Sequence, residues 1–181
     1  MAITREPPLC VDLDGTLIAG DTLVITVRLV AARRPWLLAV LPFVLLRGRP
    51  ALKRFLSSRI LPDPATLPWR TQVVGFVREE RARGREVCLV TAADRLVAQS
   101  VADFLPLFDR VIATDEGRNL KGSRKLAAIR KALLDNEFDY MGDSYADLPV
   151  FAAARTAYLV APSASLCRAA ESQGAVVRIF A

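Results

Sequence analysis

The chain has 181 residues, of which 52% are apolar and 24% charged, a balance typical of a folded domain with a sizeable core. It contains no histidine, which excludes Ser-His-Asp and Cys-His catalytic pairs, HExxH zinc sites and phosphohistidine chemistry. The three cysteines are scattered without a CxxC pair, so we expect buried reduced thiols rather than disulfides or a zinc site. Acid, base and nucleophile must come from carboxylates, Lys, Ser, Thr, Tyr or Cys.

The charge is unevenly distributed along the chain. The net charge is +6, and residues 21–70 hold nine basic residues against two acidic ones. This basic, apolar segment lies in an otherwise balanced chain, which suggests two parts with different tasks. The N-terminal stretch MAITREPPLC lacks the apolar core of a signal peptide, so we expect a cytoplasmic protein. The uncharged run PWLLAVLPFVLL falls short of the roughly 20 apolar residues that a membrane span needs.

The first predicted strand, Leu9–Leu13, is followed by an insertion. Residues 22–68 contain six prolines, whose spacing predicts several short helices over Thr22–Arg33, Trp36–Leu46 and Ala51–Ile60. We interpret residues 21–68 as a small helical cap inserted after the first strand. Residues 1–20 and 69–181 would form the core.

Beyond the insertion, apolar runs of strand length alternate with amphipathic stretches of helix length. The predicted helices are Leu67–Arg83, Asp94–Leu105, Ser123–Leu134 with Ser as its cap, and Ser163–Gln173. The predicted strands are Glu86–Thr91, Arg110–Thr114, Phe138–Met141, Thr156–Val160 and Ala175–Phe180. This alternation predicts an α/β fold with a doubly wound parallel sheet covered on both faces.

Four aspartates follow two of these strands. Asp12 and Asp14 lie in VDLDGTL at the end of the first strand, and Asp143 and Asp147 lie in GDSYAD after the fourth. Because the carboxyl ends of parallel strands form the ligand crevice, we expect the four side chains to converge. Carboxylates so close together repel one another unless a cation lies among them, and an all-oxygen ligand set points to Mg²⁺. Such a site favours an anionic, phosphorylated substrate.

Four motifs occur along the chain in this order: DLDGTL, Thr91 at the end of the second strand, Lys121 and GDSYADLP. In these motifs and their order, the chain resembles the haloacid dehalogenase (HAD) superfamily. The insertion stands where the helical C1-type caps of that superfamily are found. The resemblance implies a HAD-like Rossmannoid core and a Mg²⁺-dependent phosphatase. An acid at position 14 favours phosphatase over dehalogenase chemistry, since phosphate-ester cleavage needs a leaving group protonated there. A phosphomutase remains the alternative within the superfamily.

The resemblance also implies catalytic roles. Asp12 would be the nucleophile that forms an aspartyl-phosphate, and Asp14 the general acid and then the base that activates water. Thr91 would hydrogen-bond the phosphoryl group, and Lys121 would neutralise its charge beside the nucleophile. Lys121 also has a plain interpretation as an exposed lysine at a helix start, with two more lysines, Lys125 and Lys131, nearby.

For ligands, the resemblance implies that Mg²⁺ is held by Asp12, the main-chain carbonyl of Asp14 and Asp143, with Asp147 in a supporting or water-mediated place. Phosphate binding would involve Asp12, Gly15, Thr16, Thr91, Ala92 and Lys121. Asp21 is either the N-cap of the first cap helix or a substrate contact, and Asp94 is assigned to a helix cap.

Several stretches show a closer resemblance, to a HAD-type domain. Some bacterial proteins carry this domain fused to a membrane-embedded UbiA-type prenyltransferase. The stretches are PLCVDLDGTL, the apolar Arg-rich insertion, REERARGREVCLVTAADR, RNLKGSRK and FDYMGDSYADLPVF. No prenyltransferase follows within the 181 residues, so we expect a stand-alone relative or the soluble part of a longer protein.

The run Trp36–Leu46 has three interpretations. It is the packed core of the cap, or an interfacial helix whose flanking arginines meet anionic lipid headgroups, or a receptor for the tail of a lipid phosphate. Those arginines are Arg33, Arg34, Arg47 and Arg49. Nucleic acid is not an expected partner, because the segment is too apolar for a phosphate-tracking surface.

We therefore predict a phosphomonoester hydrolase that acts on a lipid-linked (polyprenyl) phosphate or a membrane-presented substrate, peripheral at the inner face of the membrane. One alternative is a phosphoserine-phosphatase-like hydrolase of a soluble metabolite. The other is a non-catalytic module that docks on a membrane prenyltransferase.

Overall fold

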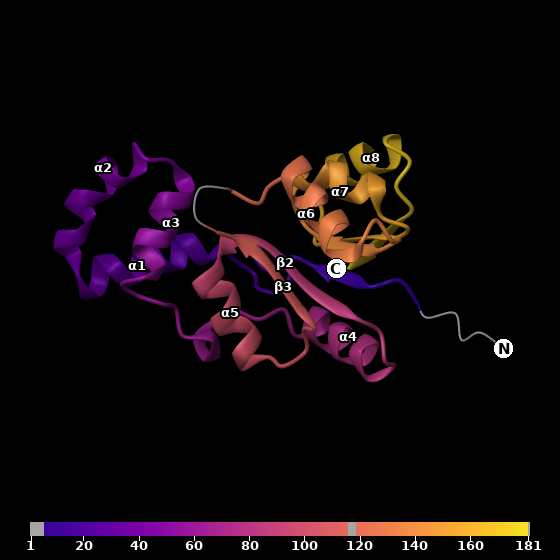
Figure 1. Cartoon of the computed structure of the whole chain (residues 1–181), viewed down its shortest axis with the longest axis horizontal. Helices are drawn as coiled ribbons and strands as arrows, with labels where there is room; N and C mark the ends of the chain where they lie inside the picture. The colour runs from indigo at the N-terminus through magenta and orange to yellow at the C-terminus, as the bar shows by residue number, and fades with distance from the viewer. Residues whose placement is uncertain (1–5, 116–118, 181) are drawn as a thin grey trace.

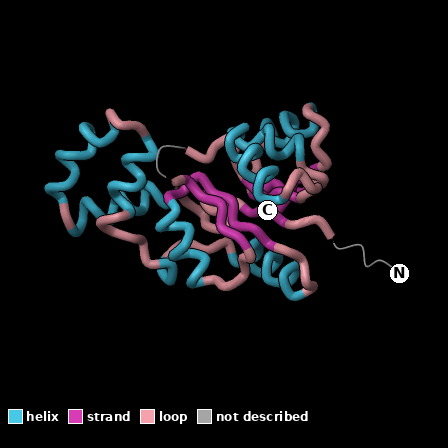
Figure 2. Tube along the Cα trace, in the orientation of Figure 1, coloured by secondary structure: helices cyan, strands magenta, loops and turns pink. Residues whose placement is uncertain are grey.

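The computed structural model describes residues 6–115 and 119–180; residues 1–5, 116–118 and 181, which the predicted core range includes, lie outside the described residues. The described chain forms a parallel sheet in the order β3-β2-β1-β4-β5-β6 (Figures 1 and 2). Its strands are β1 (Leu9–Val11), β2 (Val87–Asp94), β3 (Arg110–Thr114), β4 (Asp139–Gly142), β5 (Ala157–Val160) and β6 (Val177–Phe180). The chain winds outward from β1 in both directions, which confirms the predicted doubly wound α/β fold.

Helices cover both faces of this sheet, as Figure 1 shows. On one face lie α4 (Thr71–Ala82) and α5 (Arg95–Phe104); on the other lie α6 (Ser123–Leu133), α7 (Leu148–Ala153) and α8 (Ala164–Ser172). The strand period of two divides the core accordingly. In β1, Leu9 and Val11 pack with the apolar residues of α4 and α5, whereas Cys10 packs with those of α6 to α8.

The insertion forms a helical lobe at one end of the molecule (Figure 1). It contains α1 (Thr22–Arg33), η1 (Pro35–Val40), α2 (Leu41–Leu45), α3 (Arg49–Ser57) and η2 (Pro64–Thr66). The lobe has its own small apolar cluster around Val30, Leu56 and Ile60. None of the described helices is long and apolar enough to cross a membrane.

Proline accounts for most of the differences from the predicted helices. The run predicted as one helix over Trp36–Leu46 is the 3₁₀-helix η1 followed by α2, with Pro42 near the start of α2, where its missing N–H is tolerated. Pro50 likewise stands in the first turn of α3, which therefore begins at Arg49 rather than Ala51. Helix α4 begins at Thr71 rather than Leu67, because Trp69 is extended and forms an antiparallel bridge with Ile18.

Two smaller expectations have mixed outcomes. The predicted Ser cap of α6 is wrong: Ser123 is the first helical residue, and the cap position belongs to Gly122, which has a positive φ of 59°. The predicted reduced thiols are present, with Cys10 and Cys88 buried and Cys167 only half-buried.

A buried ion cluster secures the end of the sheet opposite the loops after β1 and β4. The carboxylate of Asp139 is fully buried and accepts hydrogen bonds from the guanidinium groups of Arg85 and Arg155 and from the N–H of Thr156. Arg85 also pairs with Glu80 at 2.7 Å. Burial opposes ionisation of Asp139, but the hydrogen bonds from Arg155 and Arg85 outweigh it and lower the pKa of this carboxyl.

We predict that Asp139→Asn lowers the free energy of unfolding by about 3–5 kcal/mol near neutral pH, because it leaves two arginines facing a neutral amide. The difference in free energy of unfolding between wild type and Asp139→Asn should become smaller as the pH falls below 3.8, the ordinary pKa of the carboxyl. Below that pH the stabilisation that comes from the lowered pKa of Asp139 is progressively lost. Urea unfolding at several pH values measures both effects. The exposed Asp103→Asn is the matched control, with an expected change within about 0.5 kcal/mol, and equal losses in the two variants would contradict the prediction.

Candidate active site

A cavity of about 430 Å³ lies at the carboxyl ends of β1, β2 and β4, beneath the cap. The core contributes most of its lining, and α1 and α3 of the cap contribute Leu23, Arg49 and Lys53. Of the predicted site residues, the lining includes Asp12, Asp14, Gly15, Ala92, Lys121, Asp143 and Asp147. The four predicted aspartates therefore meet at one cavity, where the carboxyl ends of parallel strands place them.

Asp12 is the most deeply buried acid that follows β1, with 6% of its surface exposed. One carboxylate oxygen, Oδ1, accepts the N–H of Leu13 at 2.7 Å, and the other, Oδ2, accepts a hydrogen bond from Lys125 Nζ at 2.8 Å. Burial raises the pKa of Asp12 to about 7, and Lys125 works in the opposite direction. The side chain is thus held in one position with its negative charge partly compensated.

Lys125 lies in the first turns of α6 and is 1% exposed. Its Nζ donates to Asp12 at 2.8 Å, to the hydroxyl of Tyr140 at 2.8 Å and to Asp147 at 2.9 Å, and the Tyr140 hydroxyl donates to Asp147 at 2.7 Å. An ammonium group has three protons, so every donor of Lys125 is in use. Burial opposes its charge, but Asp12 and Asp147 outweigh this and raise the pKa of Lys125.

This contact corrects the prediction that Lys121 stands beside Asp12, because Lys125 occupies that place. Lys121 precedes α6, is exposed, and lines the cavity. Lys125 shares a buried helical face with Ile129 and Leu133, and this spacing of four was the sequence signal for an inward-facing lysine. Tyr140 was not predicted; within the apolar strand β4 its hydroxyl had no distinguishing pattern.

Asp14 faces the start of the cap. Its carboxylate accepts the N–H of Thr22 at 2.7 Å and the hydroxyl of Thr22 at 3.2 Å. Burial raises the pKa of Asp14 to about 6, and the hydrogen bond from the Thr22 N–H acts against that rise. A carboxyl with this pKa can both give and take a proton near neutral pH. Asp21 is the N-cap of helix α1, and its Oδ1 accepts hydrogen bonds from the N–H groups of Leu23 and Val24. Asp21 also lines the cavity.

The turn after Asp14 is built around the carboxylate of Asp143. Gly15 has a φ of +75°, and a Cβ there would lie 1.9 Å from Asp143 Oδ2, so only glycine leaves room for this carboxylate. Thr16, fully buried, donates its hydroxyl to Asp143 Oδ1 at 3.3 Å. Burial raises the pKa of Asp143. Asp143 is thereby held against the main chain of the Asp14–Gly15 turn.

This arrangement fits a hard divalent cation in its donor chemistry. The side chains of Asp12 and Asp143 and the main chain at Asp14 supply oxygen donors only, which suit Mg²⁺. In the described part of the chain, no three acidic side chains are grouped so as to hold a metal by themselves. An ion at this place would therefore also need a main-chain oxygen. Asp147 Oδ2 accepts hydrogen bonds from Lys125 and Tyr140, so this carboxylate positions the lysine, and its supporting place near a metal stays a prediction.

The second strand ends beside the same cavity. Thr91 is fully buried, and its hydroxyl oxygen accepts the N–H of Ala93 at 3.0 Å. Ala92 lines the cavity, and its carbonyl accepts a hydrogen bond from Lys53 of the cap helix α3. Asp94 caps α5 through the N–H of Leu96 at 2.9 Å, as predicted.

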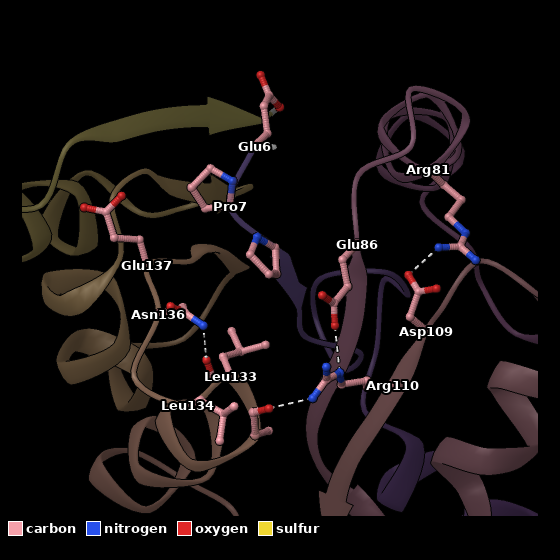
Figure 3. A pocket seen from close by; sticks show the side chains of 12 residues that line it. Glu6, Pro7, Arg81, Glu86, Asp109, Arg110, Leu133, Leu134, Asn136 and Glu137 are labelled. Atoms are coloured by element: carbon pink, nitrogen blue, oxygen red, sulfur yellow. Dashed lines mark hydrogen bonds and ion pairs between the residues drawn. The ribbon is translucent and has the colours of Figure 1, made fainter. Parts of the chain in front are cut away.

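A larger groove of about 800 Å³ lies at the opposite end of the sheet and carries no such chemistry (Figure 3). Both of its arginines are paired with carboxylates of the lining, Arg110 with Glu86 at 2.7 Å and Arg81 with Asp109. The amino ends of β2 and β3 line it, away from the edge where Asp12 and Asp143 converge.

Comparison with known proteins agrees with this geometry. The family model described as haloacid dehalogenase-like hydrolase matches residues 9–152, which span β1 through most of α7. The chain belongs to the haloacid dehalogenase-like hydrolases. A curated relative in Sinorhizobium fredii, the uncharacterized protein y4nM, is 40% identical over 157 residues, which are 86% of this chain. This chain spans 30% of the length of that relative.

Two solved structures share the fold of this hydrolase-family chain. A protein of unknown function from Bordetella pertussis Tohama I has a TM-score of 0.74 at 21% identity, covering 96% of this chain and 98% of that one. A substrate-bound phosphoserine phosphatase complex has a TM-score of 0.63 at 16% identity, covering 96% and 93%. At these identities the likeness concerns the fold.

The two lysines of this hydrolase-family site should differ in their effect on stability. In mildly alkaline buffer, where Asp12 is ionised, Lys125→Met leaves two buried carboxylates without their cation and should lower the free energy of unfolding by about 3–5 kcal/mol. The exposed Lys121→Met is the matched control, with an expected change within about 0.5 kcal/mol. Urea unfolding followed by circular dichroism measures both, and a Lys121→Met loss as large as that of Lys125→Met would refute the assignment.

Proposed function

We propose that the domain is a Mg²⁺-dependent phosphomonoester hydrolase that works through an aspartyl-phosphate on Asp12. The observation that carries the proposal is the buried contact of Asp12 with Lys125 at the base of a cavity in which Asp14 stands two residues further on. Positioning and charge neutralisation do most of the work in phosphoryl transfer, and these groups supply both.

In the first step a carboxylate oxygen of Asp12 attacks phosphorus, and the bond from phosphorus to the ester oxygen breaks. Asp14 gives its proton to that leaving oxygen. In the second step Asp14 takes a proton from water as the water attacks the phosphorus of the aspartyl-phosphate, which releases inorganic phosphate and restores Asp12. Asp12 and Asp143 with the carbonyl of Asp14 would hold Mg²⁺, which neutralises phosphoryl charge when bound.

Around these steps the chain's own residues set the geometry. Lys125, with all three donors engaged, fixes Asp12 and favours its anionic form against the effect of burial. Lys121, exposed at the cavity wall, is free to contact a phosphoryl oxygen. The two roles that the resemblance gave to Lys121 are thus divided between two lysines.

For the substrate we propose a lipid-linked phosphate, such as a polyprenyl phosphate derivative, or one presented at a membrane surface. The insertion lines the cavity with Asp21, Leu23, Arg49 and Lys53, and its residues 22–62 are rich in apolar side chains. The apolar side chains of the insertion support a leaving group with a long apolar chain. The insertion after β1 corresponds in this proposal to a C1-type cap, which selects the leaving group.

A soluble metabolite is the second candidate, supported by the shared fold with a phosphoserine phosphatase. A non-catalytic module that docks on a membrane prenyltransferase is the third. The engaged carboxylates of Asp12 and Asp14 disfavour this third candidate, because buried charges are costly to keep without a use for them.

We expect Mg²⁺-dependent phosphate release from detergent-dispersed polyprenyl phosphates, in a panel that also holds an aryl phosphate, phosphoserine and sugar phosphates. Asp12→Asn should lower turnover by roughly 10³-fold or more without unfolding the domain, because the amide is not a nucleophile. Asp103→Asn, far from the cavity, is the control. Release from phosphoserine alone would replace the lipid substrate by the soluble one, and silence across the panel from a folded protein would refute the hydrolase.

Asp14→Asn separates the acid role of Asp14 from simple binding. With an alkyl phosphate, whose leaving oxygen needs a proton, turnover should fall by roughly 10²–10⁴-fold. With an aryl phosphate bearing an electron-withdrawing nitro group, the fall in the first step should be much smaller, because that leaving group departs as an anion. Measuring the burst of aryl alcohol in single-turnover experiments isolates this step, and equal losses for both substrates would remove Asp14 as the general acid.

A further inference from the structure

The outer end of the cap exposes apolar side chains that its own small core does not use. Neither η1 nor α2 contains a buried residue. Leu37 and Leu41 pack against the cluster around Val30, so the segment is anchored on one side. The apolar tip, as we call the remainder, consists of Trp36, Leu38, Val40, Phe43, Leu45 and Leu46, with exposed fractions that reach 67% for Trp36, 70% for Phe43 and 86% for Leu46. Figure 1 places this segment at the end of the lobe away from the sheet.

The tip runs directly into a basic groove. Leu45 and Leu46 are followed by Arg47 and Gly48, which line a cavity of about 890 Å³. Four arginines line this arginine groove, namely Arg47, Arg54 and Arg59 of the cap and Arg124 in the first turn of α6. Val44 and Phe55 give it an apolar wall, and the guanidinium of Arg59 lies 3.6 Å from the centroid of the Phe55 ring.

The charges of the groove are mostly uncompensated. Among the residues that the structure describes, no carboxylate lines the groove, and Arg54 pairs with Asp94 and Asp115 beside it. For Arg47, Arg59 and Arg124 the described part of the chain provides no salt bridge within 4.0 Å. Residues 22–62 carry eight basic side chains and no acidic one. The surface therefore combines exposed apolar groups with arginines that suit phosphate oxygens.

We propose that the apolar tip and the arginine groove together dock the domain on the surface of a bilayer that contains anionic lipid. The tip enters the headgroup region, and the arginines contact lipid phosphate groups. An exposed apolar patch bordered by one sign of charge is the arrangement that interfacial segments use. The proposal goes beyond the hydrolytic reaction and holds whether or not the cavity turns over a phosphate ester.

Flotation of the full chain with vesicles tests the proposal. We expect binding to phosphatidylcholine vesicles that contain phosphatidylglycerol, little binding to phosphatidylcholine alone, and release at high salt. The chain has two tryptophans, so Trp69→Phe leaves Trp36 in the tip as the reporter. Its emission should shift to shorter wavelength with the anionic vesicles. In the complementary Trp36→Phe variant, the emission of Trp69 should stay unchanged.

Matched variants separate this surface from general charge and hydrophobicity. Replacing Arg47, Arg59 and Arg124 by Gln should weaken vesicle binding by roughly a hundredfold, since each cation near an anionic membrane contributes severalfold. The same charge loss at the exposed Arg78, Arg130 and Arg168 of the core is the control. Phe43→Asn with Leu46→Asn should abolish the Trp36 shift, whereas Leu134→Asn, at an equally exposed leucine with a positive φ of 54°, should not.

Four results would overturn the proposal. They are failure of the wild-type chain to bind anionic vesicles at low salt, equal binding to both vesicle types, retained binding in the surface variants, and concentration-dependent self-association that the tip variants remove in the absence of vesicles. The last would make the surface a contact between copies. Asp12→Asn should bind vesicles like the wild type, so a failed hydrolase assay and a failed docking assay are distinguishable.

Discussion

The buried contact of Lys125 with Asp12 is the interaction on which the proposed active site of this domain depends. Two carboxylates, Asp12 and Asp147, are removed from water here, and one ammonium group compensates both. An ionised group in a protein interior is tolerated only when paired and fully hydrogen-bonded, and all three protons of Lys125 have acceptors. Because these acceptors come from β4 and from the segments that follow β1 and β4, one side chain on α6 fixes the relative positions of the groups that would handle a phosphoryl ester.

Hydrogen bonds and an ion pair also join the cap to the core around the same cavity. Both carboxylate oxygens of Asp14, two residues beyond the proposed nucleophile Asp12, accept hydrogen bonds from Thr22, the first residue of α1. Lys53 of α3 donates to the carbonyl of Ala92 at the end of β2, and Arg54 pairs with Asp94 two residues further on. Burial lowers the pKa of Lys53, while Asp14 and Asp21 work to raise it. The lobe that carries the exposed tip is therefore tied to the proposed general acid by hydrogen bonds, so that a movement of α1 also changes the surroundings of Asp14.

The fold and the acidic end of the sheet could largely be predicted from the sequence, because strands and prolines have strong local sequence patterns. The apolar runs around Cys10, Val90 and Leu159 predicted the strands to within a few residues, and the Asp12–Gly15 turn predicted the acidic edge. The lysine that meets Asp12 did not follow from motif spacing. Lys121 and Lys125 are one helical turn apart. The predicted helix Ser123–Leu134 already left Lys121 outside, and the signal for Lys125 was its spacing of four from the buried Ile129.

The packing of the run Trp36–Leu46 could not be predicted from the sequence. Its apolar character alone fitted a packed cap core as well as an interfacial helix, since composition does not reveal which side chains find partners. The structure leaves Trp36, Phe43 and Leu46 outside, and thereby removes the packed-core interpretation for most of the run. The Ser cap expected for α6 was wrong, because Gly122 adopts a backbone conformation with positive φ that starts the helix one residue earlier than a Ser123 cap would.

Trapping the phosphorylated enzyme tests whether Asp12 forms an aspartyl-phosphate. Wild-type protein is mixed with substrate and Mg²⁺, quenched in acid within one turnover, digested and analysed by mass spectrometry. We expect one phosphoryl group on the peptide that carries Asp12, located on that residue by fragmentation, and its disappearance in later time points as inorganic phosphate accumulates. Phosphate release at full rate with no phosphorylated Asp12 at any time, or with the label on another residue, would contradict this expectation.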